Sequence, residues 1–213
     1  MTILIADDHA MFRDGLRLLL QSAGFSVVAE ADDGFAAAEL AAVHAPGVVV
    51  LDIAMPRCNG IDGAARIRDA CPAAQIIMLS AHASSEYIYR AFEAGATGYV
   101  LKDEAGSELI AAIRDVQSGD RYLSPKLSGR EFDAYALRRA LSGGSSPLET
   151  LSRREREILQ RVCEGWSSAE IADQLELSPK TVETYRSRLM QKLAIDNVPE
   201  LIKFALRHGL TTP

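Results

Sequence analysis

Short runs of apolar residues alternate with longer amphipathic stretches through the first 120 residues of the chain. The runs have the length of strands, while the stretches between them repeat apolar residues at the spacing of a helix. Strands are expected at Thr2–Ala6, Phe25–Glu30, Gly47–Leu51, Gln75–Leu79 and Thr97–Leu101. Helices are expected near residues 9–22, 34–44, 60–70, 85–94 and 105–118. This alternation predicts an α/β unit with a five-stranded parallel sheet that is covered on both faces.

A second set of helical signals begins after Pro147. Two segments, 152–155 and 167–170, have the Ser-x-x-Glu pattern of a capping box. Ser178 precedes a proline, which is a preferred start for a third helix. A fourth helix is expected over Val198–His208. The apolar stripe of the third helix consists of Val182, Tyr185, Leu189 and Leu193.

The stretch between these two regions is rich in residues that break helices. Gly119 and Asp120 end the last helix of the first unit, and residues 142–147 read Ser-Gly-Gly-Ser-Ser-Pro. We therefore expect a first domain over residues 1–118, a linker over 119–147, and an all-α four-helix domain over 148–213.

Charge is distributed unevenly along the chain. The net charge is −6, but residues 1–120 carry −9 while residues 148–213 are neutral. This difference indicates two units with different partners. The three cysteines show neither disulfide nor metal-site spacing, and we find no secretion signal and no apolar run of membrane length. We therefore expect a cytoplasmic protein without a membrane partner.

Polar residues stand at the carboxyl ends of the expected strands, where ligand chemistry gathers in an open parallel sheet. Asp7 and Asp8 follow the first strand, Asp52 the third, Ser80 the fourth, and Lys102 the fifth. In the strand order 2-1-3-4-5 the first and third strands are neighbours. The three carboxylates should therefore share one pocket.

Crowded carboxylates repel one another unless a cation is present, and Mg²⁺ suits a few carboxylates together with a phosphate oxygen. We expect Asp8 and Asp52 to be direct ligands, Asp7 to act through water or as a second direct ligand, and the backbone carbonyl of Ala54 to be a further ligand. A carboxylate is also a competent nucleophile toward phosphorus, so Asp52 is the candidate phosphorylation site. Lys102 and the Ser80 hydroxyl would hold the added negative charge.

These residues carry a family resemblance. The segments Asp7-Asp8, residues 52–60, Ser80-Ala81 and residues 99–102 resemble the receiver domain of bacterial two-component response regulators. The resemblance implies a flavodoxin-like fold, Mg²⁺, and a sensor histidine kinase as phosphoryl donor. It also implies that Tyr99 is a switch aromatic and Ser80 a switch hydroxyl, although the sequence alone favours a half-buried strand aromatic at Tyr99. We assign no role to His9 or His82.

The third helix of the second unit has a polar face suited to the DNA major groove, because bases and hydroxyls can contact phosphates and base edges. Residues 178–193 carry four basic residues and one acidic residue. The candidate DNA-binding residues are Lys180, Thr181, Glu183, Thr184, Arg186, Ser187, Arg188 and Lys192. A solvated helix face would show the same charges.

Sequence pattern favours the DNA-binding interpretation. Residues 151–159, 168–183 and 192–193 resemble the LuxR-type helix-turn-helix, and both halves together resemble the NarL/FixJ class of response regulators. The resemblance implies a transcription factor that works as a dimer on paired half-sites in double-stranded DNA, with Val198–His208 in the dimer contact. We expect the homodimer to form on phosphorylation, and RNA polymerase to be a further partner. Glu183 and Tyr185 stand where many members carry Lys and His, which leaves the DNA sequence open.

Three other kinds of protein share parts of this pattern. A phosphatase using an aspartyl-phosphate would place a second acid two residues after Asp52, but Ala54 stands there and no lid segment is evident. We therefore do not expect an enzyme. A DNA-binding protein with a vestigial receiver is disfavoured because all the site residues are present. A receiver that only sequesters a protein partner is disfavoured because the chain has a second domain.

Overall fold

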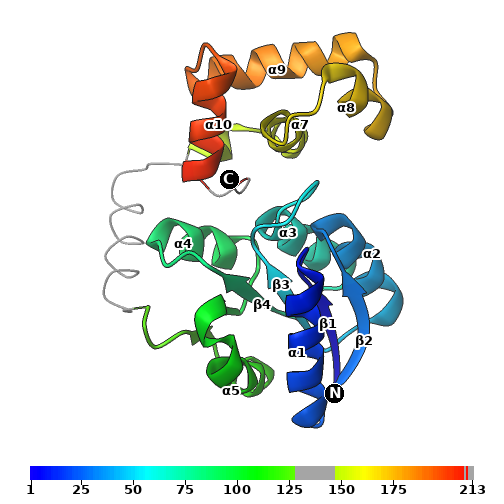
Figure 1. Ribbon diagram of the computed structural model, residues 1–213, viewed down its shortest axis with the longest axis vertical. Coiled ribbons are helices and arrows are strands. Elements are labelled where there is room, and N and C mark those ends of the chain that lie inside the picture. The colour runs from blue at the N-terminus through cyan, green and yellow to red at the C-terminus, as the bar shows by residue number, and fades with distance from the viewer. Residues whose placement is uncertain (128–146, 209, 211–213) are drawn as a thin grey trace. The chain divides into compact units, whose positions relative to one another are not determined.

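The computed structural model describes residues 1–127, 147–208 and 210. The chain divides into two compact units, Met1–Arg138 and Arg139–Pro213 (Figure 1). Each unit has its own hydrophobic core. No helix among the described residues is long and apolar enough to cross a membrane.

The first unit is built on a parallel sheet in the order β2-β1-β3-β4-β5-β6. Its strands are β1 (Thr2–Ala6), β2 (Ser26–Ala31), β3 (Val48–Asp52), β4 (Gln75–Ser80), β5 (Gly98–Leu101) and β6 (Tyr122–Leu123). Its helices are α1 (Ala10–Ser22), α2 (Gly34–His44), α3 (Gly60–Ala70), α4 (Ser85–Glu93), the 3-10 turn η1 (Lys102–Glu104) and α5 (Ala105–Gln117). The expected α/β architecture is confirmed, with strand boundaries shifted by one residue in several places.

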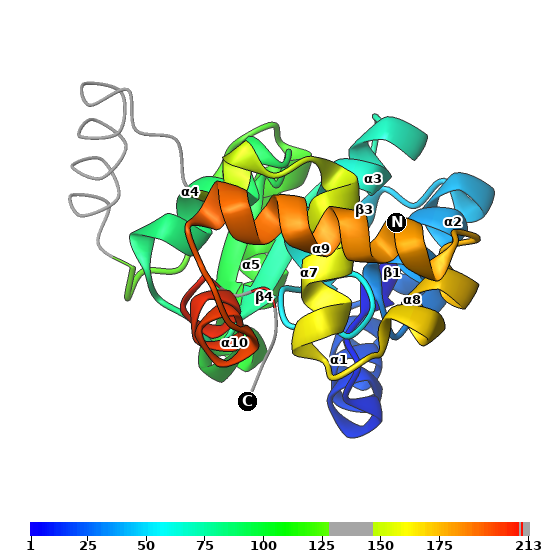
Figure 2. The same cartoon turned by 90° about the horizontal axis from the view of Figure 1, so that it is seen from above.

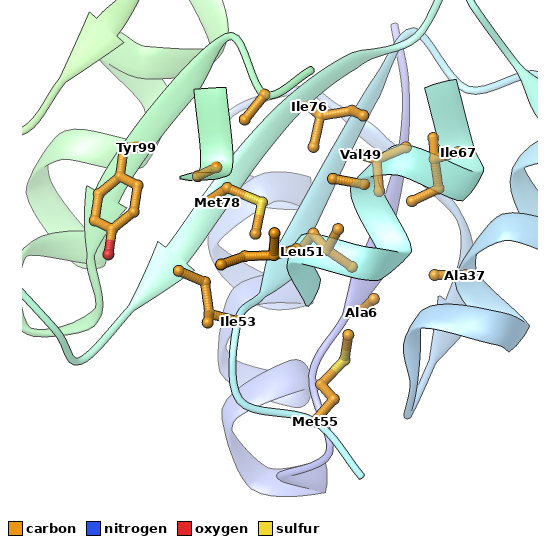
Figure 3. Packing of buried hydrophobic residues seen from close by; sticks show 14 of the residues in the cluster. Ala6, Ala37, Val49, Leu51, Ile53, Met55, Ile67, Ile76, Met78 and Tyr99 are labelled. Carbon is orange, nitrogen blue, oxygen red and sulfur yellow. The ribbon is translucent and has the colours of Figure 1, made fainter. Parts of the chain in front are cut away.

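Both faces of the sheet are buried, as the apolar run in β3 requires. Alternate residues point to opposite faces, so Val49 and Leu51 pack into the core beneath α2, α3 and α4, while Val48 and Val50 pack into the core on the α1 and α5 side. Figure 3 shows part of the first core, with Leu51 between Met78 and Ala6. The strands are therefore held between two apolar cores, which position the polar residues at their carboxyl ends.

The sheet contains one strand more than the sequence predicts. β6 pairs in parallel with β5, joining Gly98 to Tyr122 and Tyr99 to Leu123. Tyr122 and Leu127 are buried in the two cores of this unit. A strand of two residues is too short to show a pattern, which is why the sequence alone places residues 121–127 in the linker. Most of the expected linker, residues 128–146, lies outside the described residues.

The second unit has the four expected helices, preceded by a short 3-10 turn, η2 (Pro147–Thr150). They are α7 (Arg153–Cys163), α8 (Ser168–Gln174), α9 (Pro179–Leu193) and α10 (Val198–Arg207). Ser152 and Ser167 form complete capping boxes, and the Ser178 side chain accepts a bond from the Thr181 N–H. α9 lies across α7, as Figure 2 shows from above. Its stripe faces inward, with Val182 and Leu189 fully buried.

Candidate functional site

The acidic pocket lies where β1 and β3 end side by side. Ala6 pairs with Leu51, so Asp7 and Asp52 emerge from neighbouring strands. Both carboxylates are buried, while the Asp8 side chain is 31% exposed. One ligand atom from each of Asp7, Asp8, Asp52 and His9 can be chosen so that all lie within 4.8 Å of one another. The geometry brings together the three carboxylates that the sequence predicted.

Lys102 reaches into this pocket from the end of β5. Its Nζ lies 2.7 Å from Asp52 Oδ2 and 2.8 Å from Asp7 Oδ2. These two oxygens have no well-directed hydrogen bond among the described residues, so the lysine balances them mainly through charge. Burial lowers the pKa of Lys102, but the two carboxylates outweigh it and leave the pKa raised. Lys102 therefore stays charged at neutral pH.

The ionised carboxylate of Asp52 is destabilised even though Lys102 lies beside it. Burial raises its pKa to about 6, the Asp7 charge adds to the rise, and Lys102 and the Ala54 backbone N–H oppose it. Three carboxylates against one ammonium leave the pocket with a deficit of positive charge. A hard dication with oxygen ligands fits this donor set. The Ala54 backbone lies at the pocket through its N–H, and its carbonyl as a ligand stays a prediction.

His9, to which the sequence analysis assigned no role, is a member of the cluster. Its Nδ1 lies 2.8 Å from Asp8 Oδ1 and 3.2 Å from Asp7 Oδ1. Its backbone N–H donates to Asp7 Oδ1 at 2.9 Å. A single histidine after two aspartates gives no signal of its own, because a loop histidine is usually a local hydrogen-bonding group. The contacts place it at the exposed rim of the pocket.

Ser80 and Tyr99 lie together beside the pocket. Ser80 is buried at the end of β4, and its Oγ accepts a hydrogen bond from the His82 N–H at 2.9 Å. Tyr99 is fully buried in the core shown in Figure 3, and its hydroxyl donates to the His82 carbonyl at 2.8 Å. Burial raises the pKa of Tyr99, so this phenol stays protonated. The half-buried position that the sequence favoured for Tyr99 is wrong.

The candidate DNA-binding residues divide into two groups. Lys180, Thr184, Ser187 and Arg188 are exposed along one face of α9, at helical spacing. The Thr184 hydroxyl donates to the Lys180 carbonyl at 2.9 Å. Thr181 is half-buried near the cap, with its Oγ1 2.8 Å from Ser178 Oγ. Glu183 and Lys192 are exposed as well, but their side chains contact other parts of the second unit. These four side chains are therefore the part of the candidate set that a partner can reach most directly.

The remaining candidates make contacts within the second unit. Arg186 donates to Ser168 Oγ at 2.8 Å and lies 3.4 Å from Glu183 Oε1, and the Ser168 hydroxyl also donates to Glu183. Lys192 Nζ lies 2.7 Å from Glu155 Oε2 and donates to the Thr150 carbonyl at 3.1 Å. The side chains of Glu183, Arg186 and Lys192 thus join α9 to α8 and to the start of α7. The sequence pattern assigned them only to the polar face.

Two family models match the chain. Residues 3–114 match the response regulator receiver domain, and residues 149–205 match the luxR family of bacterial regulatory proteins. The oxygen regulatory protein NreC of Staphylococcus epidermidis is 36% identical over 215 residues, which covers 99% of each chain.

Solved structures show the same similarity. A LuxR-family two-component response regulator from Aurantimonas sp. SI85-9A1 is 36% identical, with a TM-score of 0.60 over 64% of this chain and 97% of that one. An RcsB–DNA complex matches 98% of both chains with 26% identity and a TM-score of 0.60. A structure of two RcsB dimers bound to two parallel DNAs matches 98% of both chains, with 26% identity and a TM-score of 0.57.

Proposed function

Because this chain belongs to the two-component response regulators of the NarL/FixJ class, with a receiver domain and a LuxR-type DNA-binding domain, we propose that phosphorylation of Asp52 controls its binding to DNA. The chain is a transcriptional regulator and not an enzyme. The observation that carries the proposal is the position of Lys102 Nζ, within 2.8 Å of both Asp7 and Asp52. This arrangement favours a receiver that still accepts a phosphoryl group over a vestigial one.

The phosphoryl donor is a sensor histidine kinase. In the transfer, the bond from phosphorus to the donor's imidazole nitrogen breaks while a bond forms from phosphorus to an Asp52 carboxylate oxygen. The imidazole leaves with the electron pair and takes up a proton. Lys102 Nζ lies 2.7 Å from one of the two Asp52 carboxylate oxygens, and Ser80 at the end of β4 offers a hydroxyl to the new phosphoryl group. Transfer of this kind depends mainly on such positioning and charge balance.

Mg²⁺ is the cation that we assign to the pocket. Asp8 and Asp52 would hold it directly, and Asp7 and the Ala54 carbonyl complete the candidate ligand set. Bound there, the ion would neutralise charge on the carboxylates and on the incoming phosphoryl oxygens. The excess of carboxylates over cations in the pocket supports this assignment.

DNA is the second partner. The exposed face of α9 offers Lys180, Thr184, Ser187 and Arg188 for phosphates and base edges. We infer a homodimer on paired half-sites, formed on phosphorylation, with α10 at its contact. The structure of two RcsB dimers bound to two parallel DNAs supports DNA binding and dimerisation by similarity. Contact with RNA polymerase is a further part of the proposal, and a regulator that binds chromosomal DNA works in the cytoplasm.

The domain boundaries are part of the same proposal. The receiver runs through Leu127, because residues 121–127 pack on its sheet. The linker then falls within residues 128–147, and the DNA-binding domain begins near Leu148, the first buried residue of the second unit's core.

The site is tested by exchanging one carboxylate for an amide. Asp52→Asn should lose phosphorylation by acetyl phosphate or by a kinase, because an amide oxygen is a poor nucleophile. Asp115→Asn, at an exposed position on α5, makes the same chemical change and should be phosphorylated like the wild type. Intact-mass measurement reads the added phosphoryl group directly. Incorporation at the wild-type rate in Asp52→Asn would place the acceptor elsewhere.

A further inference from the structure

The segment Arg121–Leu127, called here the exit segment, is bonded to the strand that carries Tyr99 and leads into Lys102. The Tyr122 N–H donates to the Thr97 carbonyl at 3.0 Å, and the Ser124 N–H donates to the Tyr99 carbonyl at 2.9 Å. These bonds continue the sheet by one short strand, β6. The exit segment ends at Leu127, and the first described element of the second unit, η2, begins at Pro147.

Ser124 extends this bonding where the strand itself has ended. Its side chain is fully buried, and its Oγ accepts the Leu101 N–H at 3.1 Å. Its carbonyl accepts the Leu127 N–H at 2.8 Å. Ser124 therefore bonds to the end of β5 through its side chain and closes a turn within the exit segment through its carbonyl. Leu101 is covalently joined to Lys102, whose ammonium contacts Asp52.

Two further contacts join the exit segment to the same region. Lys126 Nζ lies 2.9 Å from Asp103 Oδ2 on η1, in an exposed pair of the kind that contributes little to stability. Leu127 is buried in the core that also contains Tyr99 and Leu101. The buried contacts, rather than the surface ion pair, must set the position of this segment.

We propose that Ser124 is a positioning residue that couples the Lys102 end of β5 to the exit segment, and so to the DNA-binding domain. The inference rests on the proposed function of Asp52. The phosphoryl group carries about 1.5 to 2 negative charges in place of the single charge of the Asp52 carboxylate, so about 0.5 to 1 is added opposite Lys102 and displaced outward from the carboxyl group. This draws the Lys102 ammonium to a new position. The displacement passes to Leu101 by the covalent chain and from Leu101 to Ser124 by a buried hydrogen bond. Coupling of this kind requires an element whose position is shifted both by the state of Asp52 and by DNA binding.

The test compares three serine variants at matched phosphorylation. Ser124→Ala removes the acceptor of the Leu101 N–H, Ser124→Thr keeps a hydroxyl, and Ser107→Ala removes an exposed hydroxyl that bonds the Glu104 carbonyl. The readout is the ratio of DNA affinities with and without phosphorylation, with the phosphoryl group on Asp52 quantified by mass. A residue that only stabilises the fold would leave this ratio unchanged.

Ser124→Ala should be phosphorylated on Asp52 but show an affinity gain smaller by about tenfold, while Ser124→Thr and Ser107→Ala keep the full gain. A wild-type gain in Ser124→Ala overturns the coupling and leaves the role of Asp52 intact. Absence of phosphorylation on Asp52 in the wild type overturns the proposed function itself.

Hydrogen exchange of the wild-type full chain decides the matter even where Ser124→Ala does not fold. Phosphorylation should change the exchange of residues 98–104 and 121–127 together, because the Leu101 and Leu127 amides both bond to Ser124. If Asp52 is fully phosphorylated and either segment keeps its exchange rate, the coupling is wrong.

Discussion

Lys192 Nζ lies 2.7 Å from Glu155 Oε2, although the two residues are 37 positions apart in the sequence. The same Glu155 oxygen accepts the Ser152 N–H and completes the capping box of α7. Lys192 therefore ties the end of α9 to the start of α7. This contact distinguishes Lys192, which holds α9 in place, from Lys180 and Arg188, which are exposed on the same helix.

Lys192→Met should lower stability rather than weaken DNA binding directly. Leaving the buried Glu155 carboxylate without its lysine should cost about 1 kcal/mol, a modest figure because the lysine is partly exposed. The slope of log affinity against log salt should stay at its wild-type value. In the matched variant Arg188→Gln the slope should become shallower by about 0.9 for each phosphate that the protein no longer neutralises. Thermal melting and salt-dependent DNA binding of both variants check the prediction, and a shallower slope in Lys192→Met would show that Lys192 binds a phosphate.

Glu183→Lys should strengthen binding to random DNA. The Glu183 carboxylate is held by Ser168 and by Arg186, so the change removes a negative charge from α9 and also releases Arg186. Each added phosphate contact should steepen the salt dependence by about 0.9. Asp196→Lys makes the same charge change at an exposed position after α9 and should have the smaller effect. If both variants strengthen binding to random DNA equally, Glu183 acts only through the net charge. If the slope of log affinity against log salt does not change in Glu183→Lys, the side chain at position 183 does not approach the DNA.

The second domain should lose stability in mild acid. Burial raises the pKa of Glu155, but Lys192 and Ser152 outweigh it and leave the folded-state pKa below its ordinary value of 4.5. A carboxylate with a lowered pKa stabilises the fold above its unfolded pKa, and this contribution disappears as pH falls through the folded one. Melting temperature measured from pH 7 to pH 3 should therefore drop below about pH 4.5. The Glu155→Gln variant should have a lower melting temperature than the wild type at pH 7 and a smaller fall between pH 7 and pH 3. An equal fall in the wild type and the variant would assign the effect to other carboxylates.

Chelating divalent cations should block phosphorylation of Asp52 without unfolding the receiver. The pocket then keeps three carboxylates facing one lysine and repels an incoming phosphoryl group. Circular dichroism checks the fold, and mass measurement in EDTA, then in excess Mg²⁺, checks the reaction. Full phosphorylation of Asp52 in EDTA would contradict a role for a divalent cation in the reaction.

The sequence predicted those parts of the molecule that follow from local pattern. The apolar run of β3 and the aspartates after β1 lead directly to a buried sheet with a carboxylate pocket at its edge. Contacts between distant side chains carry no such pattern, which is why the contact of Lys192 with Glu155 was missed. His9 adjoins Asp7 and Asp8, but the sequence does not distinguish a pocket residue there from a histidine that only makes local hydrogen bonds. β6 was missed for a related reason, because its bonding is completed by the side chain of Ser124 rather than by a longer strand.

Control of DNA binding by Asp52 is tested most directly by capturing genomic DNA fragments with the full chain, before and after phosphorylation, and measuring affinity for the fragments recovered. The wild type should bind a defined set of fragments more tightly when Asp52 is phosphorylated, and should dimerise under the same conditions. Asp52→Asn treated in the same way should bind as the unphosphorylated wild type does. Equal affinity and an equal oligomeric state in wild-type protein with and without the phosphoryl group on Asp52 would contradict the account.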